Sequence, residues 1–165
     1  MRHRGHGEEG SALVETALTI IVMFSLLFGV IQISLAAYSF HYVSNAAHEA
    51  SRYAIVRGGG WGTACSSYSD SMCTASADNI KNYVHQRSVS YPGISIATSN
   101  VCVHYWSSVQ SPAPTTCTDS TGSTTYNSVG DIVQVTINYP FTFSAPGIPS
   151  YTYTLTSTSM MVIAQ

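Results

Sequence analysis

The chain has 165 residues, of which 45% are hydrophobic and only 8% are charged, and its formal net charge is -2. The Lys and Arg residues, six in total, provide no basic stripe to neutralise phosphates, which argues against nucleic acid as a partner. The length is enough for one modest globular domain in addition to other segments. The apolar residues concentrate near the N-terminus, which is a poor fit to a soluble cytosolic enzyme.

The N-terminal region predicts a membrane-spanning helix. Residues 1–10 are polar and carry Arg2 and Arg4, whereas residues 16–40 contain no Asp, Glu, Lys or Arg. A helix rises about 1.5 Å per residue, so roughly 20 apolar residues cross a bilayer core, and Leu18–Ala37 meets that length. The two arginines predict a cytoplasmic N-terminus, with the rest of the chain outside.

The helix is expected to continue past the membrane as a stem. Small and apolar residues recur there at spacings of three and four, which is typical of one narrow helix face. These residues are Val43, Ala46, Ala47, Ala50 and Ala54. Glycines 58–60 are expected to end the helix, because glycine is costly inside a helix and common just past its end. The predicted helix therefore covers residues 11–57.

The remaining segment, residues 58–165, is rich in Ser, Thr, Tyr, Gly and Val, which favours strands and turns. The expected elements are a short helix near Ala77–Arg87 and strands at Ile94–Ala97, Val101–Val109, Ile132–Phe143 and Tyr151–Ala164. In the last strand Tyr151, Tyr153 and Leu155 alternate with threonines, which indicates one buried face. The predicted fold class is α+β: a long transmembrane and stem helix packed on a small antiparallel sheet with disulfides.

Four cysteines lie beyond the hydrophobic segment, at Cys65, Cys73, Cys102 and Cys117. The sequence contains no Cys-x-x-Cys pair, so a zinc site or a covalently attached haem is a weak interpretation. An even number of cysteines past a membrane segment indicates disulfides outside the cytoplasm. The pairs Cys65–Cys73 and Cys102–Cys117 are favoured because each closes a short loop, and free or mixed thiols are the alternative.

A carboxylate, Glu15, stands at the cytoplasmic entry of the predicted span, five residues after Gly10. An unpaired charge at that position is costly, so it usually has a partner. Cleavage after Gly10 would give Ser11 a charged amine that could pair with Glu15 of another copy, which relieves the penalty on both charges. Gly10 lacks a side chain, which suits close approach of a protease to the backbone. The cleavage site Gly10–Ser11 and the assembly residue Glu15 are the candidate functional positions.

This arrangement of a basic leader, a glycine and a helix with Glu at the fifth mature position resembles the prepilin family. The stem segment Tyr42–Ala54 is similar to the post-membrane segment of TadE-like pseudopilins of tight-adherence pilus systems. The run Tyr139-Pro140-Phe141, followed by a Thr-rich strand, is similar as well. The resemblance covers about the first 60 residues well and about the last 35 loosely.

The resemblance implies a structural subunit with three parts: a leader at 1–10, the transmembrane and stem helix at 11–57, and an extracytoplasmic domain at 58–165. A prepilin peptidase would process it in the bacterial inner membrane, and an inner-membrane assembly platform would transfer it to an extracellular filament. Its other partners would be further pilin subunits, bound through the helix. No cofactor or metal is implied.

Two other interpretations fit parts of the sequence. A secretory signal peptide cleaved after Ser34-Leu35-Ala36 would have a shorter apolar region and no internal carboxylate. An uncleaved bitopic envelope protein, acting as a binding or scaffold module, is physically reasonable and is the main alternative. An enzyme is not expected, because the chain contains no Gly-x-Ser-x-Gly, His-Glu-x-x-His or phosphate-loop motif.

Overall fold

The structure is a computed structural model that describes residues 7–62, 65, 67, 71–108, 117, 126–145 and 148–164. Its elements are helix α1 (Gly7–Val56), helix α2 (Ala77–Val89), a 3-10 turn (Thr98–Asn100) and strands β1 (Val101–Trp106), β2 (Ile132–Ala145) and β3 (Ile148–Val162). The strands form one antiparallel sheet in the order β1-β2-β3. This arrangement confirms the predicted α+β class with a long N-terminal helix and a small sheet.

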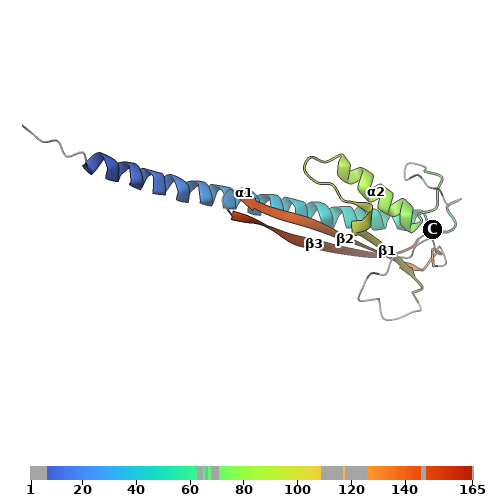
Figure 1. Cartoon of the computed structure of the whole chain (residues 1–165). Helices are drawn as coiled ribbons and strands as arrows, with labels where there is room; N and C mark the ends of the chain where they lie inside the picture. Colours follow the sequence, from blue (N-terminus) through green and yellow to red (C-terminus); the bar gives the residue numbers. More distant parts are fainter. Residues whose placement is uncertain are drawn as a thin grey trace, which may run out of the picture.

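Helix α1 runs the length of the elongated molecule, and the sheet lies along its C-terminal half (Figure 1). Strands β2 and β3 pack against α1, whereas α2 packs against both α1 and β1. The two helices thus form one layer and the sheet the other. The N-terminal part of α1 projects beyond the sheet domain.

The small-residue face of the stem is the helical side of the core, as its spacing predicted. Val43, Ala47, Ala50 and Ala54 have no exposed surface, and they join β-strand residues such as Val135 in one hydrophobic cluster. Alanine side chains allow the helix axis to approach the sheet closely, because they fill little space between the backbones.

The C-terminal end of α1 is capped by segments that are distant in sequence. The amide of Ala164 donates to the carbonyl of Ile55 at 3.2 Å, and the amide of Ala75 donates to the carbonyl of Arg57 at 2.8 Å. Gly59 follows, and a Cβ there would lie 2.8 Å from the carbonyl oxygen of Asn127. Carbonyls that a helix end leaves unpaired thus gain partners from the rest of the domain.

Helix α2 begins where its sequence predicts, at Ala77. Ser76 is its N-cap, with the side chain accepting a hydrogen bond from the amide of Asn79 at 3.2 Å. Asp78 lies in the first turn and Arg87 in the last, and both charges complement the helix dipole.

The predicted strand Ile94–Ala97 was wrong. The backbone of Ile96 bonds to α2 instead of a strand: its amide donates to Ser88 Oγ at 2.9 Å, and its carbonyl lies 2.7 Å from His85 Nδ1. Side chains of α2 therefore form the hydrogen bonds of both backbone polar groups of Ile96, so no strand partner is needed. Ile94 and Ile96 are nevertheless buried, as the apolar pattern suggested.

The other three strands lie where they were expected, with shifted ends. Strand β1 ends at Trp106, and the predicted end at Val109 lies outside the described residues. Strands β2 and β3 form a long hairpin in which Phe143 pairs with Tyr151 and Ile132 with Val162. The residues of β2 that face α1 include Val133, Val135, Ile137 and Phe141, all of which are buried.

Two disulfides stabilise the sheet domain. Cys65 is bonded to Cys73 and Cys102 to Cys117, with Cα–Cα distances of 5.2 and 6.1 Å. These are the two pairs that close the shortest loops in the sequence. The described residues include no free cysteine.

Candidate assembly surface

The N-terminal segment of α1 has no cover from the rest of the chain. Every residue from Gly10 to Leu27 is exposed, including the large apolar ones. Those residues are Leu13, Val14, Leu18, Ile20, Ile21, Val22, Met23, Phe24, Leu26 and Leu27. Among the described residues, α1 is the one helix long and apolar enough to cross a membrane by length and composition. A surface this apolar needs lipid or other protein around it.

Glu15 lies on this exposed surface. Its backbone carbonyl accepts a hydrogen bond from Thr19 Oγ at 2.9 Å, and its side chain is exposed. One turn earlier, Thr16 Oγ donates to the carbonyl of Ala12 at 2.8 Å. These bonds satisfy the threonine hydroxyls within the helix. The exposed carboxylate of Glu15 is accessible to a partner from outside the chain.

Gly10 and Ser11 are both helical and exposed. Helix α1 begins at Gly7, so the Gly10–Ser11 peptide bond lies in its first turns rather than ahead of it. A Cβ on Gly10 would meet no atom within 4 Å, so this glycine is not required by packing. Arg2 and Arg4 of the predicted leader lie outside the described residues.

Further along α1, the β2–β3 hairpin approaches the apolar segment. Gln32 Nε2 donates a hydrogen bond to the carbonyl oxygen of Ser144 at 2.6 Å. The hairpin therefore reaches the middle of α1, within the predicted span Leu18–Ala37 (Figure 1). Sequence reasoning missed this contact, although Gln32 is the one amide side chain in residues 16–40, and a polar group in such a segment usually has a partner.

A groove of about 720 Å³ lies between α1 and the hairpin. It is lined by Ile21, Phe24, Ser25, Phe28, Gly29, Gln32 and Ile33 of α1 and by Phe143, Ser144, Pro149 and Tyr151 of the hairpin. Ile21, Phe24 and Ile33 of its lining are also exposed, so the groove is continuous with the exposed apolar surface of the helix.

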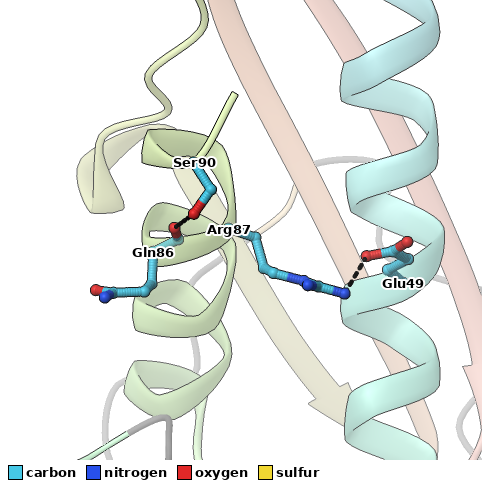
Figure 2. Close-up of polar contacts among 4 residues, drawn as sticks. All are labelled: Glu49, Gln86, Arg87 and Ser90. Carbon is cyan, nitrogen blue, oxygen red and sulfur yellow. Dashed lines mark hydrogen bonds and ion pairs between the residues drawn. The ribbon is translucent and has the colours of Figure 1, made fainter. Parts of the chain in front are cut away.

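A second pocket, of about 250 Å³, lies between α1 and α2. Arg87 of α2 reaches across to Glu49 of α1 at 3.7 Å (Figure 2). The rings of Tyr42 and Tyr91 lie 4.9 Å apart beside this ion pair. Burial, followed by the influence of Tyr91 and Glu49, raises the pKa of Tyr42 to about 12. The two helices are therefore joined here by an ion pair and by an aromatic contact in which Tyr42 stays protonated.

The first half of α1 thus combines an unpartnered apolar surface, a glycine at a predicted cleavage position and one exposed carboxylate near the end of the span. Residues 10–52 match the family model of the TadE-like proteins. The match starts at Gly10, includes Glu15 and ends within the stem. It leaves out α2, the sheet and all four cysteines. No curated protein and no solved structure matched the chain.

TadE-like proteins are structural pilus components, and this chain is similar to them over residues 10–52, about a quarter of its length. The matched residues coincide with the exposed apolar segment and most of the stem. The similarity is therefore confined to α1, whereas the disulfide-containing domain is described by its structure alone.

Proposed function

We propose that the protein is a pilin-like structural subunit that is cut after Gly10 and assembles through α1 into, or primes, an extracellular Tad-like filament. The observation that carries this proposal is the overlap of the TadE-like match with the uncovered apolar segment of α1. A helix with apolar side chains on all sides suits a subunit that moves from lipid into a bundle of like helices.

Before assembly, α1 anchors the subunit in the bacterial inner membrane. Arg2 and Arg4 keep the N-terminus in the cytoplasm, and the sheet domain lies outside. The disulfides Cys65–Cys73 and Cys102–Cys117 support this side for the domain, because such bonds persist in oxidising compartments.

During assembly, the new amine of Ser11 in one subunit pairs with Glu15 of another. The surrounding apolar side chains exclude water, so this charge pair fixes the register between helices. Prepilin peptidase, the inner-membrane assembly platform and other pilin subunits are the partners that this pathway needs.

The intact mass of the protein, measured in native envelopes and in sheared filaments, tests the proposal. We expect a chain that starts at Ser11, enriched in the sheared fraction. A Gly10→Leu variant should keep its full-length mass, whereas the control Gly7→Leu should be processed normally, because only Gly10 precedes the cut bond.

Two results would contradict this function. A full-length mass confined to membranes would favour an uncleaved bitopic anchor. A mass that starts at Ala37 would indicate a secreted domain released by signal peptidase.

A further inference from the structure

The hairpin tip, residues 141–145 and 148–153, exposes aromatic side chains beside the membrane segment. The alternation of Tyr151 and Tyr153 predicted a buried face, yet these side chains are 68% and 57% exposed. They pair with Phe143 and Phe141 on the same face of the hairpin, the face directed toward α1. The core ends at Phe141, which is 8% exposed, so the rest of the chain covers the two tyrosines only in part.

The length of the uncharged helix places the hairpin tip at the outer membrane boundary. Residues 16–40 extend about 38 Å at helical rise, whereas a hydrocarbon core is about 30 Å thick. The excess of about 8 Å corresponds to roughly one headgroup layer. A core that starts at Thr16 ends near Leu35, about one turn beyond Gln32. The contact between Gln32 and Ser144 therefore falls near that boundary.

The chemistry of the hairpin suits this location. Residues 132–165 contain no Asp, Glu, Lys or Arg. Two pairs of polar side chains near the tip bond to each other: Thr142 Oγ lies 3.0 Å from Thr152 Oγ, and Thr156 Oγ donates to Asn138 Oδ1 at 2.8 Å. Paired polar groups lose little on leaving water, and tyrosine is enriched at membrane interfaces.

We propose that the hairpin tip is a second membrane contact, which inserts into the outer leaflet just below the headgroups, at the depth of Gln32. Lipid chains of that leaflet fill the groove between Phe24 and Phe28 of α1 and Phe143 and Tyr151 of the hairpin. The groove is open on the surface of the span itself, so lipid is its occupant in the unassembled subunit. This inference rests on α1 spanning the membrane, but not on cleavage or filament assembly.

The full chain in bilayer vesicles with lipid brominated near the headgroup tests this contact, because bromine quenches tryptophan only at close range. The native Trp61 follows the end of α1, and Trp106 pairs with Ile132 at the far end of β2. Both are expected to stay unquenched. In Tyr151→Trp, or in Tyr153→Trp as a second variant, the added emission should be largely lost in brominated vesicles.

Met160→Trp is the matched control, since Met160 is 54% exposed on the same strand but lies about 30 Å from Tyr151 at strand rise. Its added emission should persist. Equal emission of the tip and control variants in brominated lipid would overturn the inference, whether water or a second copy covers the tip. Flotation of the same vesicles tests separately whether α1 anchors the protein. Protein that floats but whose tip tryptophan is not quenched contradicts the inference about the tip alone. Protein that does not float contradicts both the anchor and the tip contact.

Discussion

At the scale of single residues, Glu15 and Gln32 are the polar side chains that matter most in the apolar segment. Gln32 has its partner within the chain, the carbonyl of Ser144. Glu15 is exposed, and no partner of its carboxylate occurs among the described residues. The cost of a carboxylate reaches about 2.5–3.5 kcal/mol at mid-bilayer and is smaller near the edge. A bonding partner supplied by a neighbouring subunit would remove that cost.

Replacing Glu15 by Ala should leave the fold and the membrane insertion intact and strongly reduce filament assembly. Insertion needs only the apolar helix, whereas the proposed charge pair needs the carboxylate. The measurement compares subunit amounts in sheared filaments and in membranes. Glu49→Ala is the control, because it removes an exposed carboxylate from the stem. Normal filaments from the Glu15 variant would refute the pairing.

At the scale of the elements, the contact between α1 and the sheet depends on small side chains. Ser51 has no exposed surface, and its hydroxyl is within bonding distance of the carbonyls of Ala47, at 3.0 Å, and Ser159 of β3, at 3.3 Å. Ala47 and Ala50 are also fully buried. A larger side chain at these positions would separate the helix from strand β3.

We therefore expect Ala50→Leu to destabilise the sheet domain by about 1–3 kcal/mol, the usual cost of overpacking a core. Ser44→Leu adds a large side chain to an exposed position of the same stem and should change stability little. Thermal unfolding of both full-length variants in the same detergent measures the difference. Equal midpoints would show that the stem and sheet are not tightly packed.

At the scale of the whole molecule, charge and covalent links are separated along the long axis. Residues 16–40 and 132–165 contain no charged side chain and meet at the hairpin, whereas the ion pair Arg87–Glu49 joins the two helices farther along α1. Disulfide Cys102–Cys117 starts from β1, which pairs with the end of β2 far from the hairpin tip. One end of the molecule thus suits lipid, and the other is stabilised for an aqueous, oxidising compartment.

Disulfide mapping of the protein from native envelopes should recover the peptides joined by Cys65–Cys73 and Cys102–Cys117. Each bond should contribute about 2–4 kcal/mol by restricting the unfolded chain, so reduction should lower the unfolding midpoint. A reduced and alkylated sample is the control for the mapping. Recovery of a Cys73–Cys102 bridge would contradict this topology.

Local sequence patterns were enough to predict the long helix, the small-residue face of the stem, helix α2 and the three strands of the sheet. Periodicity, helix-ending glycines and the absence of charge are local signals, and they are strong over residues 16–60. They identified Gly10, Ser11 and Glu15 as candidates for the same reason, since these lie at fixed offsets from the apolar run. Their cleavage and assembly roles stay predictions.

The position of the hairpin, and which of the alternating apolar faces are buried, depend on tertiary contacts. Ile94–Ala97 has the alternation of a strand, yet His85 and Ser88 of α2 bond the backbone of Ile96. Tyr151 and Tyr153 have the alternation of a buried face, yet they extend past the core. Periodicity reports which side chains share a face, but burial depends on what packs against that face, and that partner comes from elsewhere in the chain or from the membrane.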